Sequence, residues 1–506
     1  MPIRHNVLAN LVGRLWAALM SFAFVPLYIR LLGIEAYGLI GLFASMMAMF
    51  ALLDLGLSLT ANRELARAAD RPDGIAAARD LLRTLEVAYW LIAAAIGIAI
   101  FLAAPLIVDH WLHIRTLDRQ TVVGGVRAMA VTALMRWPVS LYFGALTGLQ
   151  RQVSLNVVLS VGATLASAGV VAVLALVSRT VTAFFLWQAL VAGVQVLLLH
   201  RLVWHHLRLP DHRPRVGVAA VRASAGFSAA ITALTLLSIV LTQLDKVILS
   251  RMLPLDVFGR YALCSAIAAV LTTMGTAVES AVFPALSRLV ARGDGEAERR
   301  LYHQASQGLA LLIVPATTGL VVFAQELLRA YVHDAAIVAS TYRLLSLLAA
   351  GSGVLALMYM PLSLQLAHGW TSLSLVKNLV AVILFAPLLY VLILYFGALG
   401  AGGAWLILTT GYFLVEVPVM HHRLLPGEQW RWYAVDIGIP TAVAVAAFGA
   451  LRLAMPAAWP LSLQVPAIGL AYLVAVGGSA MLMPECRRII AAWRNGAFAG
   501  RQLERS

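Results

Sequence analysis

Runs of about 20 apolar residues recur from one end of this chain to the other, and each is long enough to cross a hydrocarbon core of about 30 Å as a helix. Hydrophobic residues make up 61% of the sequence and charged residues 12%, about half the charged share of a soluble domain. So little polar surface would not cover so many apolar helices in water. The sequence therefore predicts an all-α polytopic membrane protein without a sizeable soluble domain.

We expect about fourteen membrane spans, with edges good to about three residues. They run at 10–31, 37–60, 85–108, 121–147, 153–177, 181–203, 221–244, 258–283, 304–324, 341–364, 372–395, 400–420, 434–454 and 461–483. Polar, basic segments follow the sixth and the twelfth span and divide the spans into groups of six, six and two.

These groups predict four parts of the chain. They are an N-terminal six-helix lobe at 1–203, a cytoplasmic linker at 204–220, a C-terminal six-helix lobe at 221–420, and two extra helices with a cytoplasmic tail at 421–506.

A nine-residue pattern occurs twice. Residues 30–38 read RLLGIEAYG and residues 251–259 read RMLPLDVFG, and both fit Arg-x-Leu-x-x-acid-x-aromatic-Gly. The two copies lie 221 residues apart, about the length of six membrane helices with their loops. Internal repeats of helix bundles are typical of secondary transporters, whose substrate site lies between the repeats. The pattern therefore indicates transport rather than enzymatic catalysis.

The net charge of +14 raises the question of a nucleic-acid partner. The arginines, however, lie mainly in alternate loops, in clusters at 63–83, 201–215, 288–300 and 487–494. Such alternation is the signature of membrane orientation, because positive residues collect on the inner side. We therefore predict that both termini are cytoplasmic and that the protein has no nucleic-acid partner.

Residues with special chemistry are few. Cys264 and Cys486 predict no disulfide, and no metal-ligand spacing is present, so we expect no catalytic residue, metal or cofactor. The pairs His205-His206 and His421-His422 follow the sixth and twelfth spans, and we interpret them as solvated loop histidines.

Charged residues inside the spans are the candidate site, because a charge at mid-membrane costs about 2.5–3.5 kcal/mol and normally faces a cavity or a partner. The cations, which we predict to bind a diphosphate, are Arg14, Arg127, Arg136, Lys246 and Lys377. The acids, which we predict to couple an ion, are Asp54, Asp245, Glu279 and Glu416. The cations outnumber the acids, and a cationic chamber attracts phosphate groups and repels the lipophilic cations that drug exporters move.

Several candidates also have a structural alternative. Arg14 and Lys377 lie about one turn into their spans and are placed to snorkel to the headgroups. Asp245 and Lys246 are adjacent and are placed to form an interfacial pair, while Asp54 and Glu279 fit helix-end contacts. Arg136 lies near the middle of its span, and Glu416 has no cation nearby in the sequence.

Three segments resemble the oligosaccharide-repeat-unit flippases, the polysaccharide transport (Wzx-type) branch of the MOP superfamily. They are NVLANLVGRLWAALMSFAFVPLYIRLLGIEAYGLIGLF at 6–43, LTQLDKVILSRMLPLDVFGRYAL at 241–263 and AVFPALSRL at 281–289, and the likeness covers most of residues 6–420. Arg14 matches the basic position in the first span of that family, and Asp245-Lys246 match its acid–base pair in the seventh.

The resemblance implies two six-helix lobes that form a V-shaped cavity, often followed by two extra helices. It implies a flippase that carries an undecaprenyl-diphosphate-linked oligosaccharide from the inner to the outer leaflet of a bacterial cytoplasmic membrane by ion-coupled alternating access. Arg14, Arg136 and Lys377 would hold the diphosphate, and Asp54, Glu279 or Glu416 would take up the coupling proton. Expected partners are the lipid-linked substrate, membrane lipids, a polysaccharide polymerase and a chain-length regulator, with the flippase itself a monomer.

Three other functions remain open. A flippase for the peptidoglycan precursor lipid II also needs a cationic cavity, and a multidrug antiporter of the same superfamily would share the fold. A polysaccharide polymerase or ligase meets the same substrate but needs a large outer loop with catalytic His or Arg, and none is visible.

Overall fold

The computed structural model describes residues 12–13, 16–54, 56–68, 74–209, 212, 214–217, 229–456 and 458–488, with the backbone alone for 229–235. These residues are almost entirely helical, and none of them lies in a strand. Arg14 lies outside the described residues.

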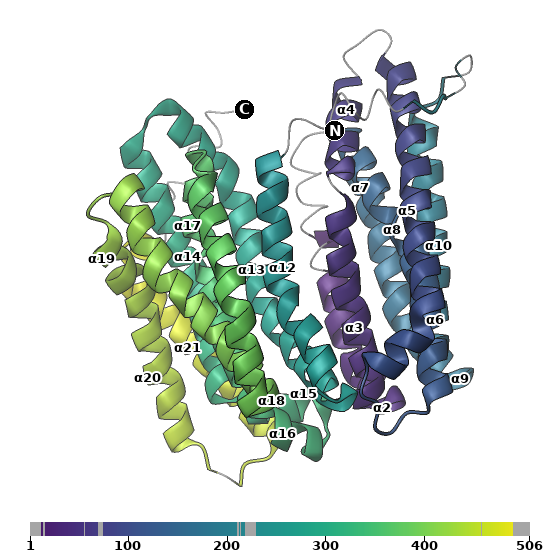
Figure 1. The fold of residues 1–506 in the computed structure, drawn as a ribbon. Coiled ribbons are helices and arrows are strands. Elements are labelled where there is room, and N and C mark those ends of the chain that lie inside the picture. Colours follow the sequence, from purple (N-terminus) through teal and green to yellow (C-terminus); the bar gives the residue numbers. More distant parts are fainter. Residues whose placement is uncertain are drawn as a thin grey trace. The chain divides into compact units, whose positions relative to one another are not determined.

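Eleven described helices are long and apolar enough to cross a membrane, and Trp16–Leu32 is a shorter apolar helix at the position of the first predicted span. Helix α12 (Ala229–Met252) covers most of the seventh span. Helix α18 (Thr371–Leu424) contains the eleventh and twelfth spans, since its helical backbone is interrupted at Gly397, where φ is 58°. The prediction of an all-α polytopic membrane protein is confirmed (Figure 1).

The chain divides into two compact units, residues 1–262 and 263–506. The helices of the first unit are α2 (Val25–Leu32), α3 (Ile34–Phe50), η1 (Ala51–Asp54), α4 (Leu57–Ala68), α5 (Gly74–His110), α6 (Arg119–Arg136), α7 (Val139–Gly148), α8 (Gln152–Thr164), η2 (Leu165–Gly169), α9 (Val170–Leu176), α10 (Val181–His206) and α12. Helix α13 (Leu255–Arg292) begins in the first unit and continues in the second.

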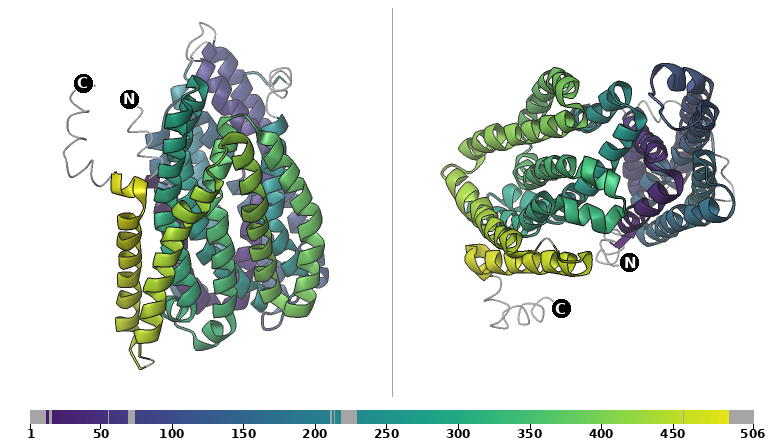
Figure 2. Two further views of the ribbon diagram at one scale, coloured as in Figure 1. Left: turned by 90° about the vertical axis from the view of Figure 1, so that its left-hand side faces the viewer. Right: turned by 90° about the horizontal axis from the view of Figure 1, so that it is seen from below.

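The remaining helices belong to the second unit. They are α14 (Gly295–Val322), α15 (Ala324–Val332), α16 (Ala335–Leu357), α17 (Tyr359–Ala367), α18, α19 (Gln429–Arg431), η3 (Trp432–Gly438), α20 (Ile439–Ala454) and α21 (Leu461–Leu482). Helix α14 packs against α16, α20 and α21, and the last two lie side by side (Figure 2). Trp432 and Phe448 are fully buried in the core of this unit.

The two copies of the repeated pattern meet inside the first unit. A Cβ atom added to Gly38 would collide with the carbonyl of Leu255, and one added to Gly259 would collide with the carbonyl of Ile34. In each case, the glycine at the ninth position of one copy lies against the residue at the fifth position of the other copy. The contact is therefore reciprocal, and it explains why glycine occupies the ninth position in both copies.

The acidic position of the pattern has a shared role as well. The Glu35 carboxylate accepts hydrogen bonds from the backbone N–H groups of Arg115 at 2.6 Å and Thr116 at 2.8 Å. Asp256, its counterpart in the second copy, lies 3.5 Å from the Arg115 guanidinium. Both acids thus bind the same loop between α5 and α6, and this loop links the two copies.

Candidate functional site

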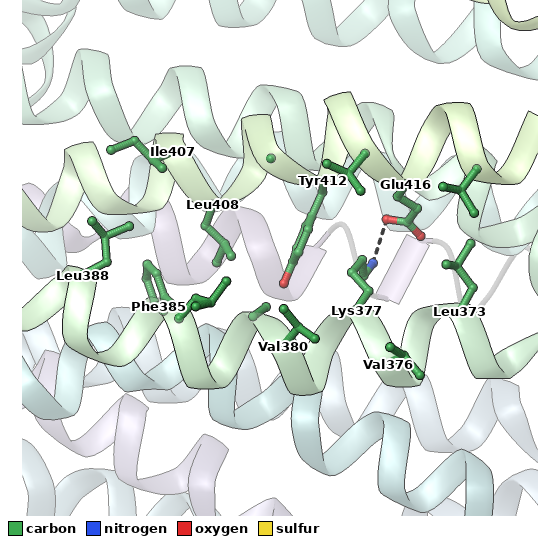
Figure 3. A pocket seen from close by; sticks show the side chains of 15 residues that line it. Leu373, Val376, Lys377, Val380, Phe385, Leu388, Ile407, Leu408, Tyr412 and Glu416 are labelled. Carbon is green, nitrogen blue, oxygen red and sulfur yellow. Dashed lines mark hydrogen bonds and ion pairs between the residues drawn. The ribbon is translucent and has the colours of Figure 1, made fainter.

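The candidate site is a groove between the two arms of α18. The arms run side by side in opposite directions, because the chain reverses at Gly397, and they enclose about 450 Å³. Its walls are almost wholly aliphatic and aromatic, with Lys377 and Glu416 as the two charged residues among those that line it. Figure 3 shows the two side chains pointing toward each other from opposite arms.

Lys377 and Glu416 form a nearly buried ion pair. The Lys377 Nζ atom lies 2.8 Å from Glu416 Oε2, and the glutamate is 2% exposed. Gln365 of α17 donates a hydrogen bond of 2.8 Å to the other carboxylate oxygen, Oε1. Ser374 in turn donates to Gln365 at 3.0 Å, which fixes the amide. Both oxygens of Glu416 are therefore satisfied, as a buried carboxylate requires.

Tyr412 completes the polar end of the groove. The Lys377 Nζ atom lies 4.4 Å from the centre of the Tyr412 ring, within the range of a cation–π contact. The Tyr412 hydroxyl is buried and has no hydrogen-bond partner among the described residues. The groove thus offers an unused hydroxyl beside an ammonium group, and both are groups that bind an anionic oxygen.

A second ion pair joins the neighbouring candidates Asp245 and Lys246. Their charged atoms lie 3.3 Å apart, and Asp245 is buried and also accepts a hydrogen bond from Tyr261. The Lys246 ammonium donates to the Thr242 carbonyl at 2.8 Å. Two of the predicted cations, Lys246 and Lys377, are thus neutralised by two of the predicted acids. The excess of cations over acids in the sequence gives no sign of this pairing.

The other candidates stand apart. Arg127 is exposed and lies over the Phe101 ring at 5.2 Å. Arg136 is exposed and Glu279 is half-buried, and neither forms an ion pair with another described residue. The Asp54 carboxylate accepts hydrogen bonds from Ser58 at 2.8 Å and from Tyr89. The predicted roles of these residues, and of Arg14, stay predictions.

The structure also contains two buried polar networks that the sequence did not reveal. In the second unit, His303 of α14 is fully buried between two carboxylates, with Nδ1 at 2.5 Å from Asp436 and Nε2 at 3.1 Å from Glu428. Gln307 donates to Asp436 at 2.8 Å. This network joins the final helix pair to α14 through residues more than 120 positions apart, so no local pattern could have indicated it.

The interpretation of the His421-His422 pair as solvated was wrong for its first member. His421 is 1% exposed, and it lies in the last turn of α18 rather than in a loop. Its Nδ1 contacts the Val417 carbonyl at 2.9 Å, and Tyr302 contacts its other nitrogen at 3.3 Å. The helix continues past the predicted span and thereby turns one histidine inward and the other outward.

The second network surrounds Glu86 of α5 in the first unit. Glu86 is 2% exposed, and its Oε1 accepts a hydrogen bond of 2.8 Å from Trp204 and lies 2.9 Å from His200 Nδ1. Tyr142 donates to the same oxygen at 3.0 Å, and Arg83 lies 3.3 Å from the other. Glu86 lies at the start of the predicted third span, 85–108, and the sequence pattern indicates no role for it.

Comparison with solved structures shows which known proteins share this fold. The lipid II flippase MurJ in an inward closed conformation matches with a TM-score of 0.71 and 12% identity, covering 93% of this chain and 97% of that one. An inward-facing multidrug resistance MATE family transporter of the MOP superfamily matches with a TM-score of 0.65 and 14% identity, covering 81% and 94%. A MOP superfamily transporter from Pyrococcus furiosus matches with a TM-score of 0.54 and 14% identity, covering 85% and 94%. These proteins are described as transporters or a flippase, and none as an enzyme.

No curated protein matches the sequence. A family model described as "Polysaccharide biosynthesis protein" matches residues 3–290, which is more than half of the chain. The chain therefore belongs to the polysaccharide biosynthesis protein family and has the fold of the MOP superfamily transporters.

Proposed function

We propose that this protein is a flippase for a lipid-linked oligosaccharide, most specifically an undecaprenyl-diphosphate-linked repeat unit used for surface polysaccharide. It would act in a bacterial cytoplasmic membrane with both termini inside and move its substrate to the outer leaflet by ion-coupled alternating access. The family and the fold support transport of a polysaccharide precursor. The nature of the sugar and the coupling to a proton are parts of the proposal.

The observation that carries the proposal is the Lys377–Glu416 pair at the polar end of an apolar groove. A buried ion pair adds little net stability, because the desolvation of two charges offsets their attraction. A diphosphate is a second anion that can satisfy Lys377, and it carries more charge than the carboxylate. Exchange of the carboxylate for the diphosphate at Lys377 therefore costs far less free energy than placing a phosphate against an apolar wall without a cation.

Glu416 supplies the proposed coupling. Once a diphosphate takes over Lys377, the carboxylate is left buried with the Gln365 amide as its remaining partner. A buried carboxylate without a cation favours its neutral, protonated form. Binding of the substrate would therefore draw a proton to Glu416, and release of the substrate would return that proton when the ion pair forms again. The lipid tail would lie along aliphatic side chains such as Leu384 and Leu388.

The test is a double variant that separates transport from folding. Lys377→Met with Glu416→Leu replaces the pair by apolar side chains of similar volume, which buried sites tolerate. In a host that lacks its own repeat-unit flippase, we expect the double variant to reach wild-type levels in the membrane and to restore no surface polysaccharide. Arg423→Gln, which removes one exposed charge from the same helix, serves as the matched control and should restore export.

Full export by the double variant would show that the pair is structural and would remove it from the mechanism. The wild-type chain is also tested for rescue of a host that lacks its lipid II flippase. Rescue there, combined with failure to restore surface polysaccharide, would assign the chain to the peptidoglycan precursor instead.

A further inference from the structure

A second groove lies in the first unit, between α8 and α10, and its two ends differ in chemistry. The apolar end is lined by Val157, Val161, Leu165, Trp187, Leu190 and Val194, among others, and encloses about 280 Å³. The basic end encloses about 850 Å³ and is lined by His200, Arg201, Trp204, His205 and Arg208, with Ser154 opposite. Val157, Val158 and Leu198 line both ends, so the two form one continuous groove, called here the α8–α10 groove.

The basic end presents cations from the C-terminal end of α10. Arg201 and His205 are four residues apart and lie on the same side of the helix, and Arg208 follows shortly after the helix ends at His206. All three line the groove and are exposed. No carboxylate is found among the described residues that line this groove. Neither arginine forms an ion pair with any other residue that the structure describes.

Hydrogen bonds order the wall behind these cations. Glu86 holds the Trp204 indole at 2.8 Å and His200 at 2.9 Å, and it is nearly fully buried beneath them. At the far end, Trp187 donates to the Leu165 carbonyl at 2.8 Å and Gln188 donates to the Ala166 carbonyl at 3.1 Å. Both carbonyls belong to the π-helical turn η2, whose altered bonding presents them to α10 and fixes the apolar end.

The length of the apolar end identifies the kind of molecule that fits. Trp187 and Leu198 are eleven residues apart on α10, a rise of about 17 Å. One leaflet accounts for half of a hydrocarbon core of about 30 Å, or about 15 Å. The apolar end is therefore as deep as one acyl chain in one leaflet, and it is much shorter than an undecaprenyl chain. Its basic end is then at headgroup level.

We propose that the α8–α10 groove is a binding site for an anionic phospholipid, with an acyl chain along the apolar end and the headgroup phosphate between Arg201 and Arg208. Charge complementarity supports an anionic rather than a zwitterionic lipid, because the basic end is lined by two arginines and by no carboxylate among the described residues. The predicted orientation places this end at the inner surface, where anionic lipids attract basic residues. The site is independent of the groove between the two arms of α18 and of the proposed substrate.

The test titrates the purified full-length chain in detergent with phosphatidylglycerol, phosphatidylcholine and undecaprenyl diphosphate, and counts bound lipid by native mass spectrometry. Arg201→Gln with Arg208→Gln should weaken phosphatidylglycerol binding roughly 30-fold, from about fivefold for each basic residue near an anionic headgroup. Arg288→Gln with Arg292→Gln removes the same charge from exposed positions on α13 and should leave binding unchanged.

The apolar end has its own pair of variants. Val161→Trp fills the groove and should weaken binding at least several-fold, whereas Leu186→Trp places the same indole at an exposed position of α10 outside the groove and should not. Equal binding of phosphatidylcholine, or equal loss in the two arginine double variants, would overturn the proposal. Tighter, competitive binding of undecaprenyl diphosphate would also overturn it and would make the groove a substrate site.

Discussion

The groove between the two arms of α18, called here the α18 groove, and the α8–α10 groove are both largely apolar, but their charged residues differ in pairing and exposure. In the α18 groove the cation is nearly buried and is paired with a carboxylate 2.8 Å away. In the α8–α10 groove the arginines are exposed, and the nearby acid, Glu86, lies behind the wall and is occupied by Trp204 and His200.

The difference indicates two kinds of ligand handling. A paired cation accepts an anion only by exchange, so binding is coupled to the fate of the displaced carboxylate. Unpaired, exposed arginines attract an anion without displacing another, so binding there is governed by local charge and screening. The first arrangement suits a step in a transport cycle, and the second suits a resident lipid.

The largest expected effect concerns the stability of the α18 pair. Lys377→Met alone leaves the Glu416 carboxylate buried without a cation, and we expect the free energy of unfolding to fall by about 3–5 kcal/mol. The double variant with Glu416→Leu should be no less stable than wild type. By contrast, Arg201→Gln with Arg208→Gln should change stability by less than about 0.5 kcal/mol. Unfolding of the full chain in detergent measures all three, and equal losses in the single and double variants would contradict coupling within the pair.

The next effect concerns the wall of the α8–α10 groove. Glu86→Ala leaves Trp204 without its acceptor and leaves Tyr142 with His200 as its remaining partner, and we expect a loss of about 2–3 kcal/mol in the free energy of unfolding. Glu86→Gln should cost less, because its amide oxygen still accepts a hydrogen bond. Phosphatidylglycerol binding should weaken in Glu86→Ala, since the Trp204 side chain is released. Unchanged stability in Glu86→Ala would show that the network is not what orders this wall.

A smaller effect is expected when the Tyr412 hydroxyl in the α18 groove is removed. Tyr412→Phe removes a buried hydroxyl that has no described partner, so we expect stability to rise by about 1 kcal/mol. Export of polysaccharide should nevertheless fall, because the hydroxyl is placed to bind the substrate phosphate beside Lys377. Melting temperature and surface polysaccharide are measured on the same variant. A rise in both would mean that the hydroxyl has no part in transport.

The smallest effect is that of salt. Raising ionic strength from 0.1 to 1 M shortens the screening length from about 10 to about 3 Å. Phosphatidylglycerol binding at the exposed arginines should then weaken about threefold. The stability difference between Lys377→Met and wild type should stay the same, because a nearly buried pair is screened little. A salt-dependent stability difference would place the Lys377–Glu416 pair in contact with solvent and would remove the contrast between the grooves.

Much of the fold follows from local sequence properties. An apolar run long enough to cross a membrane has one good solution, a helix, because every backbone group must be satisfied within the segment. The sequence also contains the repeated pattern. Within the first unit, the glycine of each copy lies against the fifth residue of the other copy, and the acids of both copies contact one loop. The candidate residues Lys377 and Glu416 were also identified, since a charge is conspicuous in an apolar span.

The pairing of those residues was not predictable. Lys377 and Glu416 are 39 residues apart, and whether they meet depends on where α18 reverses and how its arms are rotated. The same holds for His303 and Asp436, which are 133 residues apart. Arg201 and Arg208 indicate membrane orientation in the sequence, but no sequence pattern indicates that α8 forms the other wall of a groove beside them.

The sequence by itself determined that the chain is a helical membrane protein with an internal repeat and charges inside its spans, because hydropathy and spacing are properties of a segment and its immediate neighbours. Only the tertiary structure decided which charges are neutralised, which are left exposed and which line a groove. The physical reason is that electrostatic pairing acts over a few ångströms in space, and the register and rotation of packed helices, rather than their distance along the chain, set those few ångströms.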